Sequence, residues 1–499
     1  MKINDLLHKV YGTNPNDKSS LQPKEAIAYG VAGFGQNFIC TIIGSYITIF
    51  MTDALLFGSI QEGGIFGALN GATAVAFLML GVRIFDAFND PIMGSIVDRT
   101  RTKWGKCRPF LKWMAIPIAV MTIACFIPLP AKTLSTFIII AALYTLWSVA
   151  YTIADVPYWG LSTCMTNDTV VRGNLLTITR LLCTLGAGLV TVGVPIITSA
   201  VTAKYRDEAG NVLPEFIQAN ADTLKYTYFI CALVFTVLAV PMFFYGFKHT
   251  RERFTSTDAP PSLGHNLKLL FKNKELLLVV VSGILGGARM VYTYTGGLYF
   301  AKYVLKDEGL YGLITLMVVP GGLVASILVP WMSKKFTKKW AYIGVHVLGA
   351  LVMFAMYFIG YDAPWKLVVC AIGLVLLGIP QGVNNIITYA MIGDTVDYLE
   401  WKTGERGEGI CFAMQTLINK VGMAVGAFVG VMAFSWAKIN PEATPAITPE
   451  GEQTLWNVLI LAGALSMVGT IIPMLFYTIT EKKQAQMVKE IAERKANAK

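Results

Sequence analysis

The sequence predicts an all-α membrane protein with twelve transmembrane helices in two bundles of six. Three observations predict this class. The 499-residue chain is 55% hydrophobic and 14% charged, with a mean hydropathy of +0.56, whereas soluble chains carry about 25% charged residues. Twelve apolar stretches are long enough to span a bilayer, for which about 20 residues suffice. Basic residues gather in alternate connections between these stretches, which indicates an orientation.

The twelve apolar stretches fall into two sets of six. They lie at 26–52, 66–97, 110–129, 135–165, 174–200, 225–247, 276–304, 309–332, 340–360, 366–394, 408–436 and 454–479. We expect an organisation in four parts: an N-terminal bundle over 1–247, a cytoplasmic middle loop over 248–275, a C-terminal bundle over 276–479 and a basic cytoplasmic tail over 480–499. Two halves of like orientation suit a carrier that works by alternating access.

Lysine and arginine predict the orientation of the helices. Both are frequent after the second, sixth and eighth stretches and in the tail, whereas the last odd-numbered connection, 438–453, has three glutamates and one lysine. Cytoplasmic loops carry the positive excess in membrane proteins. Both termini are therefore expected in the cytoplasm, and the net charge of +10 reflects topology rather than nucleic-acid binding.

Charged residues inside the second stretch are the clearest functional signal. Such charges are costly in a bilayer and persist mostly where they serve a pathway or a partner. Asp86 and Asp90 are four residues apart and share a helix face, with Asn89 beside them and Arg83 one turn earlier. Pro91 leaves one helical carbonyl without its usual partner. The stretch therefore predicts a cage of oxygens for a monovalent cation or a proton.

The fourth stretch has the pattern of a sugar site. Asp155 is an isolated carboxylate near its middle, and Tyr151 and Trp159 lie four residues to either side on the same face. An aromatic surface beside a hydrogen-bonding carboxylate suits a sugar, whose ring face is apolar and whose hydroxyls are polar. The alternative is a packing cluster in which Asp155 pairs with an arginine.

Other charged residues within or beside apolar stretches allow two interpretations each. Arg180 and Lys420 could bind substrate or neutralise the acids, and Arg289 could bind substrate or pair with a remote helix. Asp394 and Asp397, at the inner end of the tenth stretch, are expected to form a gate or network with the basic loops, and Arg83 is expected to take part in gating as well. Ordinary surface charge at a helix end is the competing interpretation.

The remaining reactive residues argue against an enzyme. The eight cysteines fall almost all within apolar stretches and none pairs at metal-ligand spacing, so neither disulfides nor a zinc site are expected. The chain has no G-x-x-x-x-G-K-[ST], no H-E-x-x-H and no G-x-S-x-G motif. We therefore predict a transporter that needs no cofactor, not an ATP-driven machine or a hydrolase.

Several motifs give the chain a family resemblance. The run D-A-F-N-D-P-I-M-G at 86–94 and the basic loop at 101–109 resemble the signature of the glycoside–pentoside–hexuronide:cation symporters, which have the major facilitator fold. Runs at 151–159, 394–398 and 415–420 are similar to further family signatures. The likeness extends from about Tyr29 to the end of the twelfth stretch.

The resemblance implies two sets of site residues. One set forms the coupling-cation site, and would coordinate the ion directly if it is Na⁺ or Li⁺: Asp86, Asn89, Asp90 and Thr152. The other set contacts the substrate: Tyr151, Asp155, Trp159, Arg180, Gln415, Thr416 and Lys420, the last of which would lie between the cation site and the sugar site. In both sets the assignment rests on the matching motif and not on spacing alone.

One position departs from the resemblance. Asn37 stands where a galactoside-carrying member of the family has an aspartate that binds sugar hydroxyls. Asn37 thus removes a negative charge from the expected substrate site, and Arg289 adds a positive one. Both changes favour an anionic sugar such as a hexuronide.

The function implied is symport of a sugar or glycoside with Na⁺ or H⁺ across a bacterial cytoplasmic membrane. The expected partners are the sugar, the coupling cation and the lipid bilayer, and we expect a monomer. Two other functions remain open: a cation-coupled carrier for a non-sugar solute, and a sugar sensor that no longer transports. A sensor usually needs an added signalling domain, and the tail at 480–499 is short.

Overall fold

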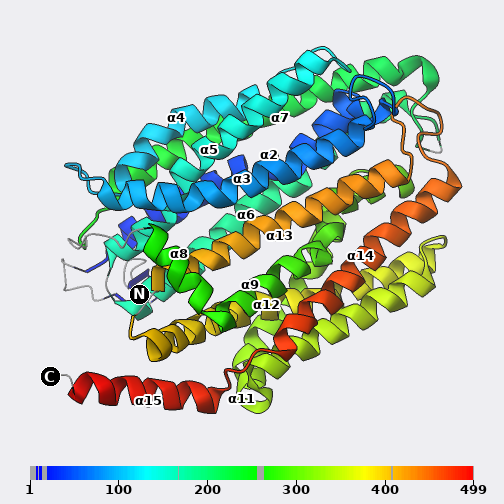
Figure 1. Cartoon of the computed structure of the whole chain (residues 1–499). Helices are drawn as coiled ribbons and strands as arrows, with labels where there is room; N and C mark the ends of the chain where they lie inside the picture. Colours follow the sequence, from blue (N-terminus) through cyan, green and yellow to red (C-terminus); the bar gives the residue numbers. More distant parts are fainter. Residues whose placement is uncertain are drawn as a thin grey trace. The chain divides into compact units, whose positions relative to one another are not determined.

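The computed structural model describes residues 7–8, 10–13, 20–166, 168–208, 210–254, 263–405 and 408–497. In this part of the chain the regular structure is helical (Figure 1), apart from two isolated bridges, Thr102 with Gly105 and Arg206 with Val212. Eleven helices in the described residues are long and apolar enough to cross a membrane. The prediction of an all-α membrane protein is confirmed.

The chain forms two compact units. The first consists of Met1–Pro260 and Asn440–Ala446. Its main helices are α2 (Pro23–Ile49, continued by a π-helical turn, Phe50–Ala54), α3 (Gly71–Arg99), α4 (Arg108–Ala124), α5 (Leu134–Met165), α6 (Thr169–Thr202) and α7 (Ile217–His249). Within this unit α2 packs against α6 and α7, and α5 packs against α3 and α4.

The second unit consists of Pro261–Ile439 and Ile447–Lys499. Its helices are α8 (Leu263–Lys272), α9 (Lys274–Leu285), a 3₁₀ segment (Gly286–Thr293), α10 (Thr295–Tyr299), a π-helical turn (Phe300–Val304), α11 (Leu310–Ile359), α12 (Pro364–Thr403), α13 (Glu408–Trp436), α14 (Pro449–Leu475) and α15 (Glu481–Asn497). The chain bends within α11 at Thr337, where φ is 65°. The bend separates the two predicted stretches at 309–332 and 340–360.

Several helices begin at a polar side chain that caps the first turn. Asn70 accepts a hydrogen bond from the backbone N–H of Thr73 at the start of α3, at 2.8 Å. Thr133 at α5, Asn273 at α9 and Thr448 at α14 act in the same way. Such caps satisfy backbone donors that have no partner inside the helix, and each stabilises the fold by about 1 kcal/mol.

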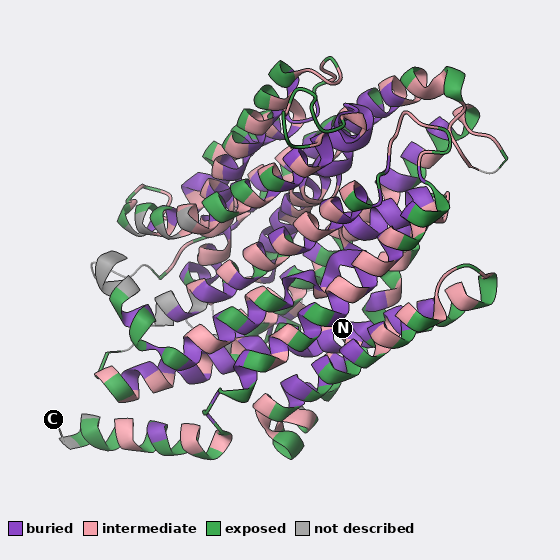
Figure 2. Cartoon of the chain, turned by 45° about the vertical axis from the view of Figure 1, so that its right-hand side comes forward, coloured by how far each residue is buried: buried purple, intermediate pink, exposed green. Residues whose placement is uncertain are grey.

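Large apolar side chains are exposed along the membrane helices. Ile327 and Phe358 of α11 are 78% and 82% exposed, and Leu185 of α6 is 62% exposed. Figure 2 shows exposed and buried stretches alternating around the long helices, whereas α15 exposes most of its surface. Extensive apolar exposure is typical of a surface that contacts lipid.

The third predicted stretch, 110–129, forms a helix that is shorter than expected. α4 spans Arg108–Ala124, which is 17 residues. Pro128 and Pro130 follow closely, and a proline cannot donate to the helical hydrogen-bond ladder. This stretch is therefore not among the eleven helices counted above.

The predicted stretch 276–304 lies within one candidate membrane span, Lys274–Val304, but the span is not a single regular α-helix. α9 ends at Leu285, the chain continues as the 3₁₀ segment, and Tyr294 is extended with φ −113° and ψ −151°. Glycines favour the interruption because each costs a helix about 1 kcal/mol relative to alanine. At Gly287 a glycine is also needed for close packing, since an added Cβ would lie 2.9 Å from the carbonyl oxygen of Gly422 in α13.

Candidate functional site

Two carboxylates of α3 meet two hydroxyls of α5. Ser148 Oγ donates to Asp86 Oδ1 at 2.5 Å. Thr152 Oγ1 lies 3.1 Å from Asp86 Oδ1 and 3.2 Å from Asp90 Oδ1, as donor to both. Asp86 and Thr152 are fully buried. A threonine has one hydroxyl proton, so Thr152 can donate fully to only one carboxylate at a time. We call these four residues the carboxylate cluster.

Two further predicted residues flank the carboxylate cluster. Arg83 Nη1 lies 3.6 Å from Asp86 Oδ2, which is an ion pair one turn apart on α3. Asn89 Nδ2 is buried, and among the described residues it has no hydrogen-bond partner. The structure therefore brings Arg83, Asp86, Asp90 and Thr152 into contact and leaves the buried amide of Asn89 with hydrogen-bonding capacity.

A second cluster gathers around Asp155 of α5. Asp155 Oδ1 accepts hydrogen bonds from Gln36 Nε2 at 2.5 Å, Trp159 Nε1 at 3.1 Å and Tyr151 Oη at 3.3 Å. The guanidinium carbon of Arg180 in α6 lies 5.5 Å from the centre of the Trp159 ring, within the range of a cation–π interaction. We call these five residues the aromatic–polar cluster; four of them were predicted as substrate contacts.

Two tyrosines, one on α2 and one on α5, hold these two helices together near the aromatic–polar cluster. The rings of Tyr29 and Tyr158 stack with centroids 4.6 Å apart. Each hydroxyl donates to the other residue's backbone carbonyl, at 3.1 and 3.0 Å. Both side chains are fully buried. The contact gives Gln36 of α2 a defined position relative to Asp155.

Asn37, predicted as a substrate contact, bonds to its own helix. Its Nδ2 donates to the backbone carbonyl of Gly33 at 2.9 Å. The neighbouring Gln36 reaches Asp155 instead, because successive residues of a helix point about 100° apart. Gln36, and not Asn37, therefore donates hydrogen bonds from α2 to Asp155 and Tyr151.

The second unit holds the other predicted substrate contacts. Arg289 lies in the 3₁₀ segment, where its Nη1 donates to the carbonyl of Gly286 at 2.7 Å. On α13, Gln415 and Lys420 are buried and Thr416 is exposed. Gln415 Nε2 donates to Asn419 Oδ1 at 3.2 Å. α13 packs directly against the 3₁₀ segment, so these residues belong to neighbouring elements.

Asp394 and Asp397 of α12 contact the connection within α11 and the C-terminal helix. Asp394 forms an ion pair with Lys338, which follows the bend of α11. Asp397 Oδ2 accepts from Gln484 Nε2 of α15 at 2.9 Å. The backbone N–H of Lys338 also donates to Glu481 of α15 at 2.7 Å. Lys338, in a basic connection, therefore forms an ion pair with α12 and a backbone hydrogen bond with α15.

Comparison with known proteins agrees with this architecture. The sequence profile of a family described as MFS/sugar transport protein matches residues 28–481. The chain belongs to the MFS/sugar transport protein family. The glucuronide carrier protein homolog of Escherichia coli K12 is 28% identical over 428 residues, which cover 85% of this chain and 88% of that protein. The isoprimeverose transporter of Lactiplantibacillus pentosus is 26% identical, covering 96% and 93%.

The fold of this MFS/sugar transport protein also matches solved structures. A crystal structure of a nucleoside transporter superposes with a TM-score of 0.61 at 14% identity, covering 91% of this chain and 100% of that one. The predicted major facilitator fold and the predicted resemblance to the glycoside–pentoside–hexuronide:cation symporters are confirmed. The chain is a multi-pass membrane transporter and not an enzyme.

Sequence reasoning about this MFS/sugar transport protein missed two polar residues. Gln36 and Ser148 are uncharged and lie within apolar stretches, where charged residues give the stronger signal. Ser148 lies one helical turn before Thr152 on the same face of α5, a spacing that could have identified it. For Gln36 the available signal was its position beside Asn37.

Proposed function

We propose that this MFS/sugar transport protein carries a sugar or glycoside across the membrane together with one monovalent cation, Na⁺ or H⁺. One observation carries the proposal: a single helix, α5, contributes to both clusters. Ser148 and Thr152 reach the carboxylates of α3, and Tyr151, Asp155 and Trp159 form the aromatic–polar cluster. Cation and sugar would therefore act on the same rigid element.

The carboxylate cluster suits one hard cation. Carboxylate and hydroxyl oxygens are the ligands that hard cations prefer. The Thr152 hydroxyl lies within hydrogen-bonding distance of both carboxylates, at 3.1 and 3.2 Å, so Asp86 and Asp90 can both reach one ion placed between them. We assign Asp86, Asp90 and Thr152 to the ion and Ser148 to the orientation of Asp86. A proton shared by the two carboxylates would occupy the same position.

The aromatic–polar cluster suits a sugar. Trp159 offers an apolar ring face, and Asp155 offers an acceptor for hydroxyl groups. Gln36 Oε1 is buried and has no hydrogen-bond partner among the described residues, so it can accept a hydroxyl as well. The names of the two relatives above specify a glucuronide and isoprimeverose, which supports a sugar or glycoside as the substrate.

Coupling follows from the placement of both clusters on α5. Tyr151 and Thr152 are consecutive, and Asp155 follows Thr152 by three residues. A small rotation of α5 that brings Thr152 toward a bound cation must also move Tyr151 and Asp155. Occupation of one site should raise the affinity of the other by about 5- to 150-fold, and the effect must be reciprocal.

We further propose that the carried sugar is anionic. Arg289 adds a positive charge inside a membrane segment, and its Nε is buried without a hydrogen-bond partner among the described residues. A carboxylate on the sugar would be a fitting acceptor. Glucuronides should therefore inhibit uptake better than matched neutral glycosides, and Arg289→Gln should abolish that preference. Equal inhibition by both sugar types, unchanged in Arg289→Gln, contradicts the anionic substrate.

The coupling assignment is tested with Asp90→Asn in proteoliposomes. Asparagine keeps the size of aspartate and removes the charge that attracts the cation. We expect uphill sugar uptake driven by a Na⁺ or proton gradient to be lost. Movement of sugar down its own concentration gradient should continue.

The matched control is Asp222→Asn, a half-exposed carboxylate of α7 that forms an ion pair with Lys225. This variant should accumulate sugar as the wild type does. Full gradient-driven uptake by Asp90→Asn would contradict the assignment of the cation site.

A further inference from the structure

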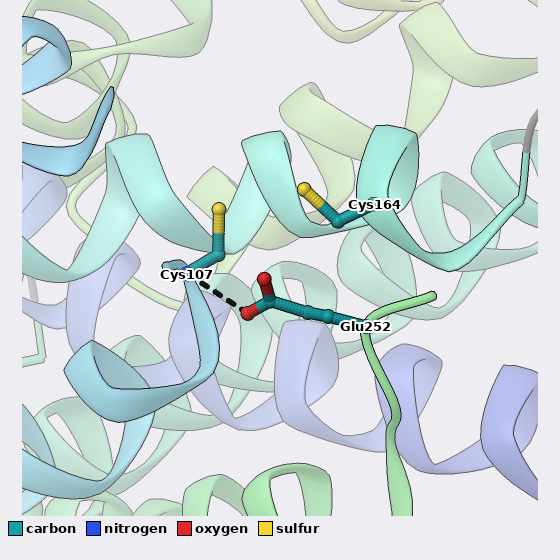
Figure 3. Close-up of side chains that lie close together, drawn as sticks. All are labelled: Cys107, Cys164 and Glu252. Atoms are coloured by element: carbon teal, nitrogen blue, oxygen red, sulfur yellow. Dashed lines mark hydrogen bonds between the residues drawn. The ribbon is translucent and has the colours of Figure 1, made fainter. Parts of the chain in front are cut away.

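Two cysteines of the first unit lie beside a carboxylate, away from both clusters. The sulfurs of Cys107 and Cys164 and a carboxylate oxygen of Glu252 all lie within 4.8 Å of one another (Figure 3). Cys107 immediately precedes α4, Cys164 is in the last turn of α5, and Glu252 follows α7. Three segments that are distant in sequence supply the three groups, so the spacing of cysteines along the chain could not reveal them.

Glu252 is held rigidly by the start of α4. Its Oε1 accepts from the backbone N–H of Cys107 at 2.8 Å and of Arg108 at 2.7 Å, and its Oε2 accepts from that of Lys106 at 2.9 Å. An ionised carboxylate has about four lone-pair positions. Three are used within the described residues, so Oε2 keeps one position there for a further partner. Hydrogen bonds of this kind orient the ligands of metal sites.

The two thiols are placed to act together. Cys107 and Cys164 are 1% and 2% exposed. Figure 3 shows both sulfurs on the same side of the Glu252 carboxylate, with the sulfur of Cys164 directed toward Cys107. Gly160, one turn before Cys164, also lies beside this pair, since a Cβ added there would be in van der Waals contact with Cys107 Sγ at 3.5 Å.

We propose that Cys107, Cys164 and Glu252 bind a thiophilic divalent cation of the Zn²⁺ class. Two thiolates and one carboxylate are a donor set that Zn²⁺ accepts, and a water molecule can complete a tetrahedron. Two sulfurs on one Zn²⁺ lie about 3.8 Å apart, given Zn–S bonds of about 2.3 Å. That separation is within the 4.8 Å limit observed. Binding transfers the two thiol protons to solvent and forms two metal–sulfur bonds.

The ion would join segments that already contact one another. The backbone N–H groups of Arg253 and Phe254 donate to the carbonyl of Cys164 at 2.8 and 3.0 Å. The guanidinium of Arg253 forms an ion pair with Glu25 in the first turn of α2 at 2.8 Å. A bound cation would therefore fasten the start of α4 and the end of α5 to the segment after α7. The site does not depend on sugar or on the coupling ion.

The test is a titration of the purified full-length protein, in detergent and with its thiols reduced, with Cd²⁺ as the probe. Cadmium–thiolate bonds give an ultraviolet charge-transfer band. We expect one Cd²⁺ per chain, displaced by Zn²⁺. Cys107→Ser and Cys164→Ser should each weaken binding at least about 100-fold, because loss of an outer partner alone costs 10- to 100-fold. Zn²⁺ should also raise the melting temperature of the wild type, but not of either variant.

Cys231→Ser and Cys370→Ser are the matched controls, since both remove a buried thiol from the interior of a helix. They should bind Cd²⁺ as the wild type does. A band that persists in the Cys107→Ser/Cys164→Ser double variant overturns the proposal, as does a fully reduced wild type that gives no band. Formation of a Cys107–Cys164 disulfide under mild oxidation with Zn²⁺ present would assign the pair to redox chemistry instead.

Discussion

Gln36 is an uncharged residue whose two polar side-chain atoms have different surroundings. Its Nε2 holds Asp155, at 2.5 Å, and its Oε1 is buried and oriented by the same amide. A hydrogen bond contributes about 0.5–1.5 kcal/mol net, and more when one partner is charged. Gln36→Leu keeps the approximate volume and removes both functions. We therefore expect sugar affinity to fall about 10-fold, measured by equilibrium binding to the purified protein.

Asn37→Leu is the matched control for that experiment. Asn37 is the next residue of α2, and its Nδ2 donates to the backbone of its own helix. Loss of the side-chain amide should therefore lower the sugar affinity less at position 37 than at position 36. A larger loss of sugar affinity in Asn37→Leu would show that Asn37, and not Gln36, is the substrate contact on α2, as the sequence resemblance implies.

The functional role of a single residue was easier to predict from the sequence when its side chain is costly to bury in a membrane. Asp86, Asp90 and Asp155 could be identified from the sequence because a carboxylate inside a membrane is energetically costly and usually has a function. Gln36 and Ser148 carry no such cost. Their contacts also join residues 119 and 62 positions apart, which no local pattern specifies. The structure was needed to connect them to Asp155 and Asp86.

At the scale of single elements, the start of α4 depends on a residue far along the chain. Cys107, the residue before α4, makes no side-chain cap, and Glu252 accepts the first backbone N–H groups in its place. A negative charge at a helix N-terminus is also favourable for the helix dipole. The loop before α4 must leave space for the carboxylate. Gly105 provides it, with φ +109° and a position where an added Cβ would overlap the Glu252 carboxylate.

Gly105→Ala should therefore destabilise the protein by about 1–3 kcal/mol, through backbone strain and the overlap with Glu252. The measurement is the melting temperature of the purified protein. In a Glu252→Ala background the same substitution should cost less, because the overlapping group is gone and the two effects are not additive.

Gly188→Ala in α6 is the control, since an added Cβ there meets no atom within 4 Å. It should leave the melting temperature unchanged or raise it slightly. An equal loss of stability in both glycine variants would contradict the specific role of Gly105.

Which elements form was predictable, but their interruptions were not. The interior of a bilayer offers no hydrogen-bond partners, so apolar stretches become helices. The break at 286–294 begins at two consecutive glycines, and the close packing of Gly287 against Gly422, 135 positions away, is a contact that no local pattern specifies. The early end of α4 was visible in Pro128 and Pro130, although hydropathy alone extended the stretch past Pro128, to residue 129.

At the scale of the whole molecule, composition and hydropathy predicted the architecture. The membrane imposes element length, charge distribution decides orientation, and the motif at 86–94 indicates the family, as the profile match over 28–481 confirms. The cytoplasmic location of the termini and the four-part division of the chain stay predictions. The proposed sugar site depends on a few side chains of α2, α5 and α6 and on Arg289, and the contacts of these side chains follow from packing and not from any average property.

The position of Thr152 between Asp86 and Asp90 also has an electrical consequence. If both carboxylates serve one ion, each cycle with a neutral glycoside moves one elementary charge across the membrane. A potential of 100 mV then supplies about 2.3 kcal/mol, which corresponds to about 50-fold accumulation. With a hexuronide the two charges cancel, and the voltage should have no effect. Imposing a potassium diffusion potential on proteoliposomes should therefore drive uptake of a neutral sugar and leave uptake of a sugar acid unchanged.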